Sequence, residues 1–192
     1  MIEGGRNTKR GGANRHIFDL QLAVVRRHKK YFLEGLKMSE TLRNSVKTMV
    51  KETFEGPPVP VKGSWFTSFE PNSGIFGVIE GMSCDQASIS VQGTTLAAHT
   101  DHIRYHMWGT NEIIKNGKQP KMDWEKSWEI HSVDEQQWNR IQVELRNEYV
   151  TLLESIDAIE WNELLANEVL SSLAHSAYHL GAIRQMLKVV KI

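Results

Sequence analysis

Residues 169–183 read VLSSLAHSAYHLGAI, and no formally charged side chain occurs among them. A helix with this sequence is apolar on nearly all sides, so it should be central in its domain. The stretch is shorter than the run of about 20 apolar residues that crosses a bilayer. We therefore expect residues 162–190 to form a buried helix of an all-α protein.

This helix carries His175 and His179, whose spacing of four residues places both side chains on one face, one turn apart. Two imidazoles in this geometry can reach one metal ion. No glutamate follows His175, so the HExxH pattern of the zincins is absent, and with it their general base. A shared ion would give both histidines a partner in an apolar interior, where an unpaired polar group is costly.

A third ligand is expected from the segment 99–106, HTDHIRYH. Its three histidines have i, i+3, i+7 spacing and therefore share one helix face. His99 and His106 are separated by two turns, about 10 Å, so they cannot both bind one ion. We predict His99 as the third ligand, with His102 in reserve. The alternative is that all these histidines are core residues bonded to the backbone or to their neighbours.

Apolar periodicity predicts further helices over about 17–36, 40–54, 94–115 and 134–159. Ser132 or Asp134 is expected to cap the last of these. Residues 57–92 are rich in proline, glycine and aromatic side chains, which indicates either short strands and turns or a packed lid. Residues 1–15 have no apolar pattern and are expected to be a flexible tail. The remainder, 16–192, should be a single domain.

The composition excludes several classes of protein. The chain has 192 residues, with 23 Lys and Arg against 23 Asp and Glu, so its net charge is zero. A chain without a basic excess has no electrostatic reason to bind nucleic acid or an anionic membrane. Cys84 is the single cysteine and no secretory leader is recognisable, which favours a cytoplasmic protein.

Two stretches, Leu96–His102 (LAAHTDH) and Ala174–Gln185 (AHSAYHLGAIRQ), resemble motifs of the DinB-like family of damage-inducible and YfiT-like metalloproteins. Asp123-Trp124 and Ser127-Trp128 resemble one branch of it. The resemblance covers about residues 16–190, with the strong motif matches in the last hundred.

The resemblance implies a four-helix bundle with up-down-down-up topology. The irregular segment 57–92 would then be a long loop between the first and second helices of the bundle. It implies that His99, His175 and His179 bind zinc or nickel, and that the protein is a homodimer. Some members of this family are S-transferases or isomerases that use a low-molecular-weight thiol.

Three imidazoles would leave an open position on the ion, as in catalytic sites. That position can hold an activated water or a thiolate from a small cosubstrate. We therefore expect a metal-dependent transferase or hydrolase acting on a small molecule. The alternatives are a non-catalytic metal-binding or stress-related protein with a structural ion, and an interaction module whose histidines only pack.

Trp124, Trp128 and Tyr178 are candidates for the wall of a substrate pocket, although the two tryptophans also fit as core aromatics at the end of the bundle. Arg184 lies on the face of its helix opposite the histidines. We interpret it as a structural or dimer-contact residue, with anion binding as the alternative.

Overall fold

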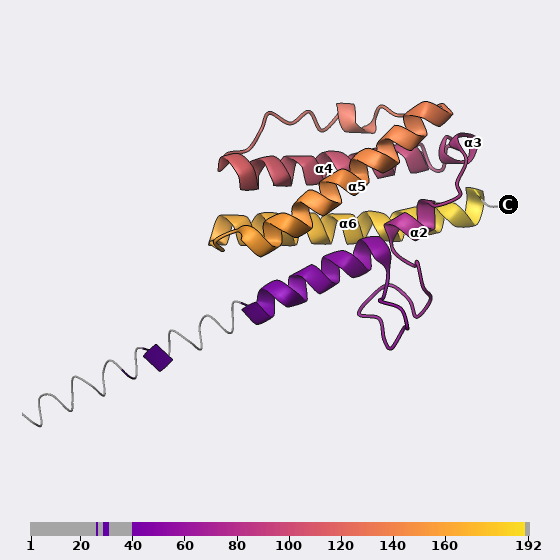
Figure 1. The fold of residues 1–192 in the computed structure, drawn as a ribbon. Coiled ribbons are helices and arrows are strands. Elements are labelled where there is room, and N and C mark those ends of the chain that lie inside the picture. Colours follow the sequence, from indigo (N-terminus) through magenta and orange to yellow (C-terminus); the bar gives the residue numbers. More distant parts are fainter. Residues whose placement is uncertain (1–25, 27–28, 31–39, 191–192) are drawn as a thin grey trace, which may run out of the picture. The chain divides into compact units, whose positions relative to one another are not determined.

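The structure of this protein is a computed structural model that describes residues 26, 29–30 and 40–190 (Figure 1). Met1–Asn44 and Ser45–Ile192 form two compact units, and the fold below is that of the second. The predicted tail 1–15 lies outside the described residues, as does most of the predicted helix 17–36. The domain boundary at residue 16 stays a prediction.

The described residues form helices and no strand, which confirms the all-α class. Residues 40–55 are helical. The later elements are α2 (Ile75–Ile79), α3 (Cys84–Ala87), α4 (Leu96–Asn116), the 3-10 helix η1 (Lys126–Trp128), α5 (Glu135–Ala158) and α6 (Glu163–Val190). The three long helices α4, α5 and α6 match the predicted ranges closely.

Local signals set the ends of these helices. The side chain of Thr95 accepts a hydrogen bond from a first-turn amide of α4, and Gly117, with φ 69°, ends that helix in the left-handed conformation. Asp134 caps α5 through a reciprocal capping box with Gln137, so of the two predicted caps it is Asp134 that is used. These caps satisfy amides that have no partner within the helix.

Helix α4 packs against both α5 and α6. The segment between α4 and α5 runs back along α4, so α4 and α5 point in the same direction (Figure 1). Three aromatic rings join the helix ending at residue 55 to α2 and α5: Phe54 lies 5.4 Å from Phe76 and 5.0 Å from Tyr149, centroid to centroid. The core of this unit therefore lies among its helices, and the histidines of α4 and α6 face each other beside it.

The irregular segment after residue 56 is held by one buried carboxylate. Glu52 accepts hydrogen bonds from the amides of Trp65, Phe66 and Thr67 at 2.9–3.1 Å and from the hydroxyls of Ser64 and Thr67. Burial raises the pKa of Glu52, but these hydrogen bonds outweigh it and lower the pKa to about 2. A single side chain thus organises the turn 64–67.

Arg184 supports the same segment from α6. Its guanidinium donates to the backbone carbonyls of Thr67, at 3.1 Å, and Ser73. In the described part of the chain the segment 57–92 forms the short helices α2 and α3 and one isolated bridge between Val91 and Thr94, so the predicted strands are absent. The side chain of Arg184 therefore has a structural role within this unit.

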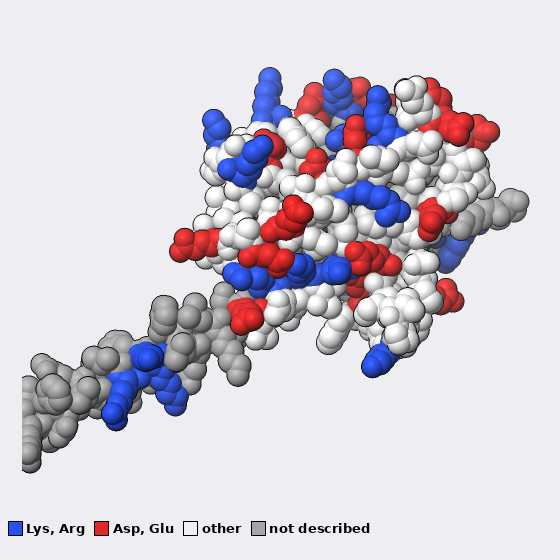
Figure 2. Space-filling model, viewed as in Figure 1, with Lys and Arg blue, Asp and Glu red and all other residues white. Residues whose placement is uncertain are grey.

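The described surface carries no large patch of one charge on the face shown in Figure 2, where Lys and Arg alternate with Asp and Glu. Among the described helices, none is long and apolar enough to cross a membrane. Helix α6, which contains residues 169–183, is buried along the side that faces the core, whereas Leu170 and Tyr178 on its other side are exposed. The prediction of a helix buried on nearly all sides is therefore wrong for this outer side.

Candidate metal centre

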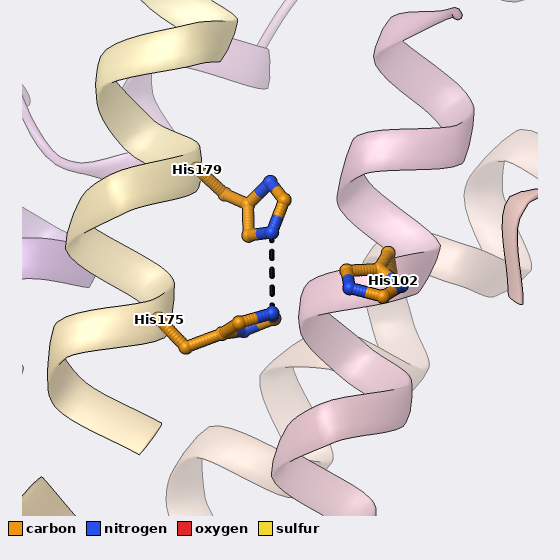
Figure 3. Close-up of side chains that lie close together, drawn as sticks. All are labelled: His102, His175 and His179. Atoms are coloured by element: carbon orange, nitrogen blue, oxygen red, sulfur yellow. Dashed lines mark hydrogen bonds between the residues drawn. The ribbon is translucent and has the colours of Figure 1, made fainter. Parts of the chain in front are cut away.

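Five histidines from α4 and α6 meet in one group, which we call the histidine cluster: His99, His102, His106, His175 and His179. Ring contacts pair His99 with His179 and His106 with His175, so α4 and α6 run in opposite directions past each other. The ring centroid of His102 is 5.0 Å from those of both His175 and His179. Figure 3 shows His102 on its helix opposite the α6 pair.

His102, His175 and His179 each offer a ring nitrogen, and the three nitrogens lie within 4.8 Å of one another. The Nε2 atoms of His175 and His179 are 3.2 Å apart. A tetrahedral zinc ion with bonds of about 2.0–2.1 Å holds its ligand nitrogens about 3.3 Å apart. The α6 pair already has that separation, and the nitrogen of His102 lies within 4.8 Å of both. These three histidines are therefore close enough to bind one metal ion.

A hydrogen-bond chain fixes the tautomer of His102. The hydroxyl of Ser127 donates to the carbonyl of Trp124 at 2.6 Å, so it accepts from His102 Nδ1, which lies 2.7 Å away. His102 therefore carries its proton on Nδ1 and presents the lone pair of Nε2. Such a hydrogen bond from the other ring nitrogen is what orients a metal-binding imidazole.

His99 contacts the centre through His179. The two Nδ1 atoms are 2.9 Å apart, so one of them donates to the other. If Nε2 of His179 faces the ion, its Nδ1 donates and His99 accepts, which makes His99 a supporting residue. His99 is not among the three histidines whose nitrogens lie within 4.8 Å. The assignment of His99 as a ligand stays a prediction, and the residue held in reserve, His102, is the one that the structure brings to the α6 pair.

Burial keeps the cluster uncharged. It lowers the pKa of His102 to about 4 and those of His175 and His179 to about 3, helped by repulsion among the neighbouring imidazoles. Burial also lowers the pKa values of His99 and His106. Because a metal ion binds the neutral imidazole, the whole cluster is in its binding form at neutral pH.

Tryptophans from the connection between α4 and α5 line one side of the cluster. Trp128 stacks on His102 with centroids 4.0 Å apart and also lies 5.1 Å from His99. Trp124 lies 5.9 Å from His102 and is partly exposed. These contacts put both residues beside the candidate centre, where an aromatic wall was predicted.

Tyr178, by contrast, is 74% exposed and meets the cluster only at the edge of His179, with ring centroids 5.1 Å apart. A substrate pocket formed by Trp124, Trp128 and Tyr178 stays a prediction.

Sequence reasoning missed two members of this site. Ser127 belongs to a motif that resembles one branch of the family, but its role depends on the 3-10 turn η1, which brings its hydroxyl to His102. His106 was not among the predicted ligands, because His99 was preferred and the two cannot both bind one ion, yet its ring stacks on His175 with centroids 3.9 Å apart. The i, i+3, i+7 row was the available signal, since it placed all three α4 histidines on one face.

No family model, curated protein or solved structure matches this chain. The likeness to the DinB-like family therefore stays a prediction, and the functional argument depends on the geometry of the histidine cluster.

Proposed function

We propose that the protein binds one divalent metal ion through Nε2 of His102, His175 and His179 and uses it as a metal-dependent transferase or hydrolase. The observation that carries the proposal is the meeting of three neutral imidazoles from two facing helices, with nitrogens within 4.8 Å. Without an ion, Nε2 of His175 and Nε2 of His179 face each other at 3.2 Å, and each has only the other as a hydrogen-bond partner among the described residues. An ion bound by both nitrogens would give each a ligand bond in this apolar setting.

The donor set favours an ion that accepts nitrogen ligands. Three imidazoles with no carboxylate among them suit zinc or nickel better than calcium or magnesium, which prefer oxygen. With three protein ligands the ion retains an open position, at which it supplies Lewis acidity toward a bound water or thiol. Our proposal is therefore a catalytic ion, with zinc or nickel as the native metal.

A thiol substrate would come from outside the chain. The sulfur of Cys84, the one cysteine, lies 3.9 Å from a carboxylate oxygen of Asp85 in α3 and makes no described contact with the histidine cluster. We therefore propose a low-molecular-weight thiol as the cosubstrate of the transferase reaction.

A second candidate is a structural ion without catalysis. The low exposure of His102 and His179, 6% and 3%, supports it, because closed structural sites exclude solvent. Chelation separates the two: a structural ion is expected to hold the fold together, and a catalytic ion to leave a folded apoprotein.

We also propose membership of the DinB-like family and its up-down-down-up four-helix bundle. The proposal is supported by the quoted motifs, by the shared direction of α4 and α5, and by the opposite direction of α6 (Figure 1). A homodimer remains part of that proposal.

The decisive experiment is metal content per chain, by elemental analysis of protein purified without an affinity tag. We expect about one ion per wild-type chain, loss of it in His102→Ala and His175→Ala, and retention in the control His131→Ala, whose side chain is exposed outside the cluster. His99→Ala should retain the ion with weaker affinity.

The two predicted ligand sets differ in this experiment. Loss of the ion in His99→Ala together with retention in His102→Ala would replace His102 by His99. A wild-type protein that takes up no added zinc, nickel or cobalt would overturn the proposed function. Loaded protein is then assayed with small thiols and an electrophile.

A further inference from the structure

A small pocket adjoins the histidine cluster on the side away from His99. Its volume is about 170 Å³, and it lies between α4, α6 and the connection 119–124. Two of its walls belong to the surroundings of the proposed metal site: His106, which stacks on His175, and Trp124, whose ring contacts His102. A molecule that extends from this pocket past His106 and Trp124 would therefore approach the proposed metal site.

One residue that lines the pocket has a buried hydroxyl without a partner. Thr110, which lines it, is only 2% exposed, and its Oγ1 has no hydrogen-bond partner among the described residues. Three other helical threonines, Thr53, Thr100 and Thr151, each donate to the carbonyl four residues earlier at 2.8–2.9 Å. Thr110 does not make this hydrogen bond. A ligand that pairs with its hydroxyl would remove the cost of leaving it unsatisfied.

The charge of the pocket points to the kind of ligand. Glu168 is its one formally charged lining residue, and no Lys or Arg lines it. Glu168 has no ion pair or hydrogen bond among the described residues. An unpaired carboxylate in a concave, partly apolar pocket favours a cationic group that can donate hydrogen bonds.

We propose that this pocket, which we call the amine pocket, binds the protonated amine of a small molecule, with the ammonium donating to Glu168 and to Thr110 Oγ1. The pocket stands on its own geometry, and its assignment to the substrate depends on the proposed function. Glu168 precedes His175 by seven residues, which is about 10 Å along α6. The substrate would then be an ω-amino compound whose reactive end, a thiol in the transferase case, lies about that far from its nitrogen.

The first test uses metal-free protein and the matched probes n-pentylamine and 1-pentanol, titrated at neutral pH and followed by NMR chemical shifts. We expect the amine to bind about tenfold or more tightly than the alcohol, as one charge-assisted hydrogen bond would give. The shifts should centre on Thr110 and Glu168. In Glu168→Gln this preference should vanish, and in Glu163→Gln, an exposed residue of the same helix outside the pocket, it should persist.

A second variant separates ligand binding from folding. Thr110→Val keeps the shape of the side chain and removes the hydroxyl. It should weaken amine binding several-fold while the melting temperature stays the same or rises, because a buried group without a partner is lost. Equal binding of amine and alcohol, or an amine preference that survives in Glu168→Gln, would overturn the amine pocket.

The third arm connects the pocket to the metal. In cobalt-loaded protein, 7-aminoheptanethiol should bind more tightly than 7-hydroxyheptanethiol by the thiolate absorption band, and Glu168→Gln should equalise them. Equal affinities in the wild type would overturn the assignment to the substrate. Since the first arm uses no metal, failure to load cobalt counts against the proposed function alone, and failure of the amine preference counts against the pocket alone.

Discussion

A substitution of Ser127 tests the proposed metal site without removing any of the three proposed ligands. The hydroxyl of Ser127 holds the proton of His102 on Nδ1, and it touches no other member of the histidine cluster among the described contacts. Ser127→Ala should lower the affinity for zinc about 10–100-fold while leaving one ion per chain, since supporting hydrogen bonds of this kind have that effect. Competition against a chelating dye measures it.

The controls for this prediction are close at hand. Ser127→Thr keeps the hydroxyl and should restore most of the affinity, whereas Ser132→Ala, in an exposed part of the same connection, should change nothing. Unchanged affinity in Ser127→Ala would mean that His102 does not bind through Nε2.

The sequence was sufficient to predict which faces of α4 and α6 carry the site, but not which histidine of α4 lies nearest the α6 pair. Spacing within α6 put His175 and His179 on one face, and spacing within α4 did the same for its histidines. Which α4 histidine lies opposite the pair depends on how far the two helices slide past each other. That register is set by packing between helices, which no spacing within one helix encodes, so His99 was preferred and His102 was found nearest.

At the scale of elements, the turn 64–67 depends on a carboxylate from the preceding helix. Removing Glu52 leaves the amides of Trp65 and Phe66 without an acceptor, whereas the amide of Thr67 keeps its bond to Ser64 Oγ and the hydroxyls of Ser64 and Thr67 keep their mutual contact. We expect Glu52→Ala to reduce the free energy of unfolding by about 3 kcal/mol at neutral pH. Urea denaturation measures it, and Glu70→Gln, an exposed acid of the same segment, is the control.

This contribution should depend on pH with a definite sign. The pKa of Glu52 falls from 4.5 to about 2 on folding, so its stabilisation is present above pH 4.5 and is lost as the pH drops toward 2. The difference between wild type and Glu52→Ala should therefore narrow on acidification. A difference that stays constant down to pH 2 would contradict the assignment.

Elements with local start and stop signals were predicted well, and the segment 57–92 was not. Thr95, Gly117 and Asp134 act on their own helices, so their effect can be recognised in the sequence. The segment 57–92 owes its path to Glu52 and Arg184, which come from outside it. Contacts of this range leave no periodic trace, which is why strands or a lid were predicted where two short helices occur.

For the whole molecule, the buried histidines make the metal-free protein sensitive to acid. Unfolded histidines take up protons below about pH 6.5, whereas His102, His175 and His179 stay neutral down to pKa values of about 3–4 in the folded state. The unfolded state binds more protons, so stability falls as the pH drops below 6.5. Each histidine contributes up to about 1.4 kcal/mol per pH unit.

Thermal unfolding of apoprotein from pH 7 to 5 checks this prediction. His175→Gln should reduce the change in unfolding free energy per pH unit by the contribution of one histidine. An unfolding free energy that is flat over this range would show that the cluster is more open to solvent than its burial implies.

Metal binding should have the opposite effect on stability. Zinc at 100 times its dissociation constant adds about 2.7 kcal/mol, which corresponds to about 5–10 °C in melting temperature for a protein of this size. His102→Ala should show no such shift. Apoprotein that melts cooperatively supports the catalytic ion, and apoprotein without a transition supports the structural one.

In the turn 64–67, the side chains and the backbone amides differ in their exposure to solvent. The side chains of Trp65 and Phe66 are exposed, while their amide protons point at the carboxylate of Glu52, which is itself buried. In deuterated water these amides should exchange about as slowly as those of a helix interior, because exchange needs the bond to open. The fluorescence of Trp65 would report the same turn as exposed to solvent. Hydrogen exchange would thus report this turn as protected, whereas fluorescence would report it as exposed to solvent.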